Sequence, residues 1–84
     1  MKSISIKDYN SSMGTLIDIE DAITYNKSHA TGAINIPYQK LIYNFKNYLN
    51  PNERYYIYCH GGVKSRRAVS ILEIYKYDVT QVLL

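Results

Sequence analysis

Short apolar segments separated by polar turns run along the whole chain. Four of them consist largely of β-forming or alternating apolar residues, which predicts strands at Ser3–Ile6, Leu16–Ile19, Arg54–Tyr58 and Val79–Leu84. A fifth extended piece, Ala33–Ile36, ends before Pro37, whose ring keeps the preceding residue out of the α region.

Between the strands, apolar residues recur at spacings of three and four, which predicts amphipathic helices. One follows Pro37, carries Tyr38, Leu41, Ile42, Phe45 and Leu49, and ends at Asn50–Asn52. Another begins at Ser65 and carries Ala68, Ile71, Leu72 and Tyr75. A shorter helix opens at Glu20–Asp21, where acidic residues suit the positive end of the helix dipole, and runs to about Lys27.

Strands that alternate with helices predict an α/β fold of three layers, with a central, mostly parallel five-stranded sheet flanked by helices. The 84 residues allow one domain, 1–84. The single Cys has no intramolecular partner, no segment could span a membrane, and the N-terminal residues lack the apolar stretch of a signal peptide. We therefore expect a cytoplasmic protein.

Charge narrows the choice of partners. Ten basic and seven acidic residues give a net charge of +3, which favours small anions or acidic partners. The density of positive charge is below that expected of a nucleic-acid-binding protein. The scattered Tyr residues also do not form the stacking signature of an RNA-binding sheet. We expect neither a nucleic acid nor a membrane as partner.

The chemistry is expected in the loop after the fourth strand, Cys59–Ser65. Gly61 and Gly62 let the backbone curl, so that the N–H groups from His60 to Ser65 can form a cradle for an anion, and the following helix adds its dipole. These groups, together with Lys64, Arg66 and His60, favour a nucleophilic thiolate at Cys59. The alternative is a buried core thiol beside a glycine turn.

Other polar residues have simpler interpretations. Cys59, His29 and His60 lack the spacing of metal ligands, so we expect no metal and no cofactor, with each His buried or capping a loop. Asp18 ends a strand, where it either orients the site electrostatically or organises a loop through hydrogen bonds.

The loop and an upstream segment together resemble the rhodanese family of sulfurtransferases. The family's active loop has a Cys, four variable residues and then Arg-Ser, and this chain reads Cys-His-Gly-Gly-Val-Lys-Ser over 59–65. The second family signature begins Asp-x-Arg and ends Gly-His-x-x-Gly-Ala-x-Asn-Ile-Pro. It is matched here by Asp18, Tyr25, His29 and Gly32–Pro37, and Tyr77–Val82 is similar to the family's last strand.

The resemblance implies a sulfurtransferase in which Cys59 takes the outer sulfur of thiosulfate or a persulfide and passes it to a thiol or cyanide acceptor, a sulfur-acceptor protein included. Substrate contacts would come from His60 to Arg66 (His60, Gly61, Gly62, Val63, Lys64, Ser65 and Arg66), with Asp18 and His29 in support. Phosphatases and arsenate reductases of the same fold have five residues between Cys and an essential Arg. That spacing is not met here, because Ser65 occupies the Arg position.

The chain departs from the family pattern in four places. Lys64 stands in place of the loop Arg, and Glu20 stands in place of the Arg that follows Asp18. Ser28 stands in place of the Gly before His29. Glu20 would either oppose a dianion at the site or point into solvent. Family members also continue past the last strand with a closing helix, which is missing after Leu84. We expect an uncovered sheet face there, and with it marginal stability or a homodimer. These departures leave open a non-catalytic rhodanese-like binding or regulatory module.

Overall fold

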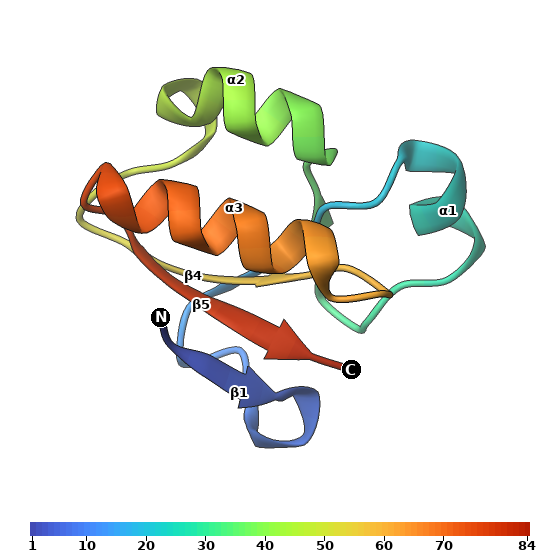
Figure 1. Ribbon diagram of the computed structural model, residues 1–84. Coiled ribbons are helices and arrows are strands. Elements are labelled where there is room, and N and C mark those ends of the chain that lie inside the picture. Colours follow the sequence, from blue (N-terminus) through green and yellow to red (C-terminus); the bar gives the residue numbers. More distant parts are fainter.

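The computed structural model describes residues 1–84, which form one parallel sheet with helices packed against it (Figure 1). The elements follow one another in the order β1 (Ser3–Ser5), a 3₁₀ turn (Ile6–Asp8), β2 (Thr15–Asp18), α1 (Ala22–Lys27), β3 (Ile34–Asn35), α2 (Tyr38–Tyr48), β4 (Arg54–Tyr58), α3 (Val63–Ile74) and β5 (Asp78–Leu83). The strands lie in the order β1-β5-β4-β2-β3, and every neighbouring pair is parallel. The predicted five-stranded α/β fold is confirmed.

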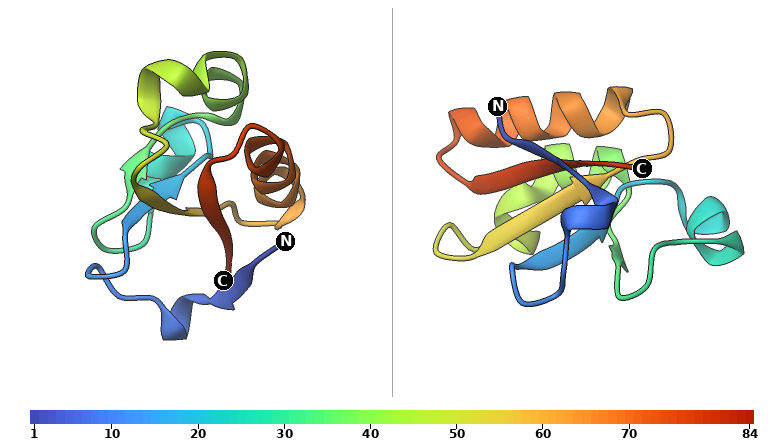
Figure 2. Two further views of the ribbon diagram at one scale, coloured as in Figure 1. Left: turned by 90° about the vertical axis from the view of Figure 1, so that its left-hand side faces the viewer. Right: turned by 90° about the horizontal axis from the view of Figure 1, so that it is seen from below.

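Alternation along β4 separates two apolar layers. Tyr55 and Ile57 face the larger core, which α2 and α3 cover with Leu41, Val69 and Leu72 among others. Figure 2 shows the two helices on the same side of the sheet. None of the helices is long and apolar enough to cross a bilayer.

The opposite face of the sheet is covered as well. Leu16, Ala33, Tyr56, Tyr58 and Val82 are buried there beneath partly buried side chains from the N-terminal segment, α1 and the loop after it: Ile4, Ile6, Tyr9, Met13, Tyr25 and Ala30. The prediction of an open face was therefore wrong, because the chain folds back over it at residues 4–13 and 25–30.

Several element ends differ from the sequence-based expectation for local reasons. The first strand stops at Ser5, because the Ser5 hydroxyl oxygen accepts a hydrogen bond from the Lys7 N–H and caps a 3₁₀ turn. α1 begins at Ala22, because Asp21 acts as its N-cap. α3 begins at Val63, two residues before the predicted Ser65, because Gly62 adopts the left-handed cap conformation.

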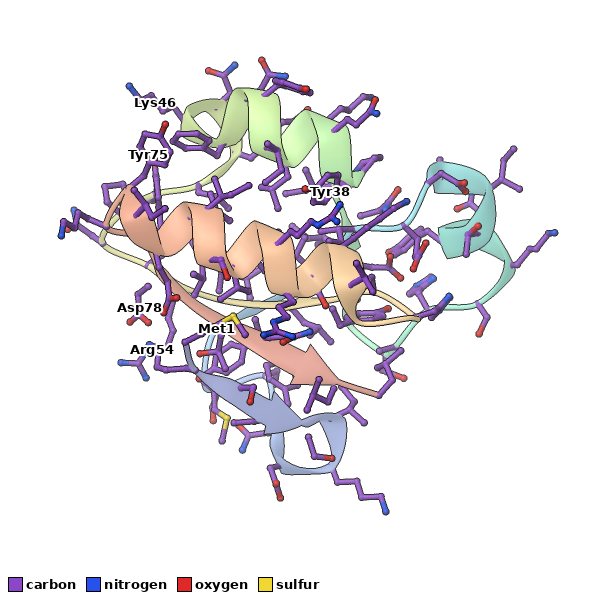
Figure 3. The ribbon with its side chains drawn as sticks, viewed as in Figure 1. Met1, Tyr38, Lys46, Arg54, Tyr75 and Asp78 are labelled. Carbon is purple, nitrogen blue, oxygen red and sulfur yellow. The ribbon has the colours of Figure 1, made fainter.

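An ion pair fixes the sheet at the end away from Cys59. The Arg54 side chain donates to Asp78 over 3.2 Å where β4 and β5 begin, and both residues are labelled in Figure 3. Lys2 also donates to Asp78. The contact with Lys2, and to a smaller extent that with Arg54, holds the pKa of Asp78 below its usual value. This pair lies at the opposite end of β4 from Cys59, which follows the carboxyl end of that strand.

Candidate functional site: a cysteine loop at the carboxyl end of β4

Cys59 directly follows the last residue of β4 and begins the loop that leads into α3 (Figure 1). It is 4% exposed and belongs to the core beneath α2 and α3. The carboxyl end of a central parallel strand is where α/β sheets place ligands and reactive groups. The cysteine is therefore both part of the core and positioned at the edge where chemistry is expected.

Two N–H groups and one hydroxyl surround the sulfur of Cys59. The N–H of Gly62 lies 3.2 Å and the N–H of Ser65 3.3 Å from Sγ, and the Ser65 hydroxyl oxygen is also 3.3 Å away. Converging N–H groups at a helix N-terminus stabilise negative charge. The loop can thus hold a thiolate at Cys59.

Only one of the two loop glycines has a backbone conformation that requires glycine. Gly62 has φ +83°, whereas Gly61 does not have a positive φ, and a Cβ added to Gly61 would meet no atom within 4 Å. The expectation that both glycines are needed for the curl is corrected to Gly62 alone. Its left-handed conformation directs the Gly62 N–H at the sulfur.

We expect Gly62→Ala to lower the free energy of unfolding by about 1 kcal/mol and to slow alkylation of Cys59, because an L-residue is strained at this φ. Urea unfolding and the rate of iodoacetamide labelling measure the two effects. Gly61→Ala is the matched control and should change neither. Equal behaviour of the two variants would contradict the assigned role of Gly62.

The N–H of His60 does not join the cradle. It donates to Glu20 Oε2 over 2.8 Å, and His60 Nδ1 is 3.8 Å from the same oxygen. The Glu20 side chain is only 17% exposed. The predicted cradle from His60 to Ser65 is therefore narrower than expected, and Glu20 packs against the loop rather than pointing into solvent.

Asp18 organises the neighbouring strand end through hydrogen bonds. It is fully buried, and its carboxylate accepts from the Glu20 N–H at 2.8 Å and from the Tyr58 hydroxyl at 2.6 Å. Burial, and then this bond to Asp18, raise the pKa of Tyr58 well above its usual value. Asp18 was expected either to orient the site electrostatically or to organise a loop through hydrogen bonds, and the structure shows hydrogen bonds of the second kind. They connect β2 to His60 through Glu20.

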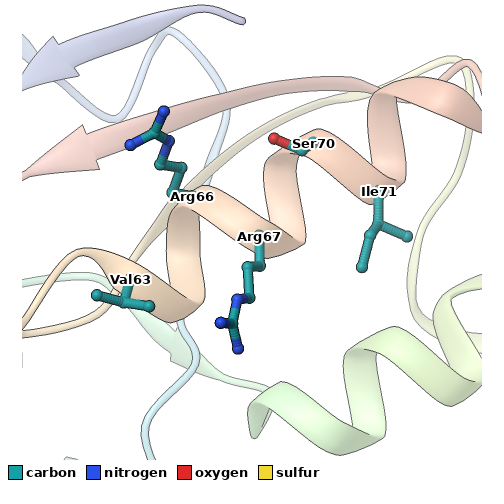
Figure 4. Close-up of a pocket in the computed structure, with 5 residues that line it drawn as sticks. All are labelled: Val63, Arg66, Arg67, Ser70 and Ile71. Atoms are coloured by element: carbon teal, nitrogen blue, oxygen red, sulfur yellow. The ribbon is translucent and has the colours of Figure 1, made fainter.

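The basic side chains at the start of α3 form no hydrogen bond with the sulfur. Lys64 is exposed and lies near Asp21, whose pKa is lowered mainly by the Thr24 N–H and to a smaller extent by Lys64. Arg66 and Arg67 line a shallow hollow of about 430 Å³ on the outer side of α3 (Figure 4). Exposed Val63 lies at the end of the same hollow. No hydrogen bond joins these side chains to Cys59.

His29 is not brought to the cysteine either. It is exposed, its Nδ1 lies 2.7 Å from the carbonyl oxygen of Tyr25, and its ring stacks on the Tyr25 ring at 3.7 Å between centroids. These contacts secure the loop after α1. No group of three His, Cys, Asp or Glu side chains could hold a metal ion.

The sequence interpretation missed two polar residues whose side chains support the loop, Tyr58 and Gln81. Each lies in a largely buried strand, and each side chain hydrogen-bonds at the carboxyl end of the sheet. A polar group in the middle of a buried strand needs a partner. That rule could have marked Gln81 from the sequence, although it could not have named the partner.

The family model of the rhodanese-like domain matches residues 5–84. Among solved structures, a rhodanese-like domain protein from Staphylococcus aureus is 31% identical with a TM-score of 0.84, and the match covers 98% of this chain and 84% of that one. A protein from Staphylococcus saprophyticus is 30% identical (TM-score 0.81, 98% and 86% covered), and a rhodanese-related protein from Thermoplasma volcanium is 25% identical (TM-score 0.88, 98% and 83%). No curated protein sequence matches. By the extent of the family match and by these structures, the chain belongs to the rhodanese-like domain family.

Proposed function

We propose that this protein is a sulfurtransferase that carries sulfane sulfur on Cys59. The observation that supports this most strongly is the convergence of the Gly62 and Ser65 N–H groups on the Cys59 sulfur, at 3.2 and 3.3 Å. A sulfur that must be an anion before and after each transfer needs donors of this kind. A buried filler thiol needs none.

The reaction consists of two displacements without net oxidation or reduction. The Cys59 thiolate attacks the sulfane sulfur of the donor, an Sγ–S bond forms, the donor S–S bond breaks, and its electron pair leaves with the donor thiolate or, from thiosulfate, with sulfite. The acceptor, a thiolate or cyanide, then attacks the outer sulfur, and Cys59 leaves as the thiolate. No cofactor is required.

An organic persulfide is proposed as the preferred donor over thiosulfate. The Glu20 carboxylate is in contact with the loop at His60, and the Lys64 charge is offset by nearby Asp21. The negative charge of Glu20 repels a dianion such as thiosulfate more strongly than a persulfide whose sulfur carries one negative charge. The identity of the sulfur acceptor, a thiol or cyanide, and the formation of a homodimer remain predictions.

Glu20→Gln tests the donor preference, because the amide keeps an oxygen acceptor for the His60 N–H and loses the charge. We expect kcat/KM for thiosulfate to rise about tenfold, which corresponds to about 1.4 kcal/mol of repulsion removed, with little change for a persulfide. Glu73→Gln makes the same change in net charge on α3 and should alter neither rate. An equal change with both donors would show that Glu20 only supports the loop.

The function itself is tested by following sulfur from donor to acceptor. Wild-type protein is incubated with glutathione persulfide or thiosulfate, with cyanide as acceptor, and thiocyanate is measured. Turnover above the uncatalysed rate is expected with at least one donor. A folded protein that gives none, with either donor, favours instead the non-catalytic binding module, for which the 4% exposure of Cys59 is the supporting observation.

A further inference from the structure

Gln81 connects β5 to the cysteine loop. It is 4% exposed and pairs with Ile57 of β4 in the sheet, and its side-chain nitrogen lies 2.9 Å from the carbonyl oxygen of Gly62 and 2.9 Å from the hydroxyl oxygen of Ser65. Figure 1 shows β5 running beneath α3, so Gln81 reaches the loop from the sheet below the helix.

The orientation of the Gln81 amide follows from its partners. The carbonyl oxygen of Gly62 can only accept, so the group facing it must be the amide nitrogen rather than the amide oxygen. The same nitrogen then directs its second hydrogen at Ser65 Oγ. Both N–H hydrogens of the side chain are used inside the loop.

While Cys59 is a thiol, it donates to Ser65 Oγ at 3.3 Å, and the Ser65 hydroxyl donates to the Gly62 carbonyl at 3.2 Å. A thiolate has no hydrogen to donate, so Cys59 Sγ then becomes a second acceptor for the hydroxyl hydrogen. A carbonyl oxygen has two lone pairs. Those of Gly62 already accept from Gln81 at 2.9 Å and from the Arg66 N–H at 3.1 Å. In the thiolate form, the hydroxyl hydrogen is therefore available to the sulfur.

We propose that Gln81 is a positioning residue that directs the Ser65 hydroxyl at the Cys59 sulfur, and so supplies the third donor to the anionic sulfur. Gln81 does this by occupying the competing acceptor and by donating to Ser65 Oγ, which polarises the Ser65 O–H bond. A hydrogen bond to a charged acceptor is stronger than one to a neutral acceptor, so the contact favours the thiolate and its persulfide. The role in turnover rests on the proposed sulfur transfer, whereas the effect on the thiolate does not.

The test compares the pH dependence of Cys59 alkylation by iodoacetamide in wild type, Gln81→Met and Ser65→Ala. Met has a similar length and no donor. We expect both variants to shift the midpoint of the alkylation profile to higher pH by about one unit. At a fixed pH below that midpoint, this shift corresponds to about a tenfold lower fraction of thiolate. Thr80→Val removes a buried hydroxyl from the opposite face of β5 and should leave the profile unchanged.

The double variant separates positioning from general damage. In the Ser65→Ala background, Gln81→Met should add little further shift, because the hydroxyl through which Gln81 acts is already absent. An unchanged profile in Gln81→Met or in Ser65→Ala, or a full additional shift in the double variant, would overturn the proposal. Should Gln81→Met not fold, Gln81→Asn, which withdraws the amide by one carbon, replaces it with the same expected shift.

Alkylation does not require sulfur transfer. A shifted profile in a protein that transfers no sulfur would therefore leave the role of Gln81 standing and overturn only the proposed function.

Discussion

Cys59→Ser is expected to lower the rate of sulfur transfer by at least about a thousandfold, to the level without protein. A serine hydroxyl is a weak nucleophile at neutral pH and cannot store a sulfane sulfur as a persulfide. The smaller side chain fits the buried site, so the fold should survive. Thiocyanate formation from glutathione persulfide and cyanide measures the rate, and circular dichroism verifies the fold.

Because this chain has a single Cys, no other thiol can take over the role. The variant thus separates chemistry from binding. A folded Cys59→Ser protein that retains more than a tenth of the wild-type rate would show that Cys59 is not the sulfur carrier.

The largest effect on stability is expected from Asp18→Ala. The substitution removes the acceptor of the buried Tyr58 hydroxyl and the acceptor of the Glu20 N–H. Stranding two such donors costs on the order of 3 kcal/mol, a large part of the 5–15 kcal/mol that a domain typically has. Urea unfolding followed by circular dichroism measures the loss.

Asp8→Ala is the matched control, because Asp8 is an exposed carboxylate in the 3₁₀ turn. It should change the free energy of unfolding by less than about 0.5 kcal/mol. If the two variants unfold at the same urea concentration, Asp18 is not the residue that joins β2 to β4 and to the loop at Glu20.

The fold could be predicted from local patterns because each element carries its own signal. Arg54–Tyr58 has the predicted bounds, since it is a run of β-formers between a turn and a glycine loop. Helix starts were less predictable where they depend on a cap. Gly62 caps α3 only because it adopts a positive φ, and a glycine does not announce that choice in the sequence.

The sequence motif marks residues of the cysteine loop that contact one another in the structure, but it does not mark the residues from other strands that support the loop. Cys59, Gly62 and Ser65 lie close together in the sequence, at the junction of β4 and α3, so a motif identifies them. Tyr58 and Asp18, and likewise His60 and Glu20, are 40 positions apart, and they meet only because β2 and β4 are neighbours in the sheet. Such pairs depend on strand order, which hydrophobic periodicity does not specify.

The packing of residues over the second face of the sheet also depends on strand order. The N-terminal residues pack over Tyr56 and Val82 because β1 joins the sheet at the edge next to β5. A pattern of short strands does not show which edge the first strand takes. The expectation of an open face followed from assigning that cover to a closing helix.

The central claim is that Cys59 carries sulfur as a persulfide, and the mass of the intact protein tests it most directly. Wild-type protein is incubated with glutathione persulfide, freed of small molecules and measured by mass spectrometry under non-reducing conditions. We expect a gain of the mass of one sulfur atom, removed by cyanide and absent in Cys59→Ser. A folded wild-type protein that stays unmodified, or an adduct that persists in Cys59→Ser, would contradict the claim.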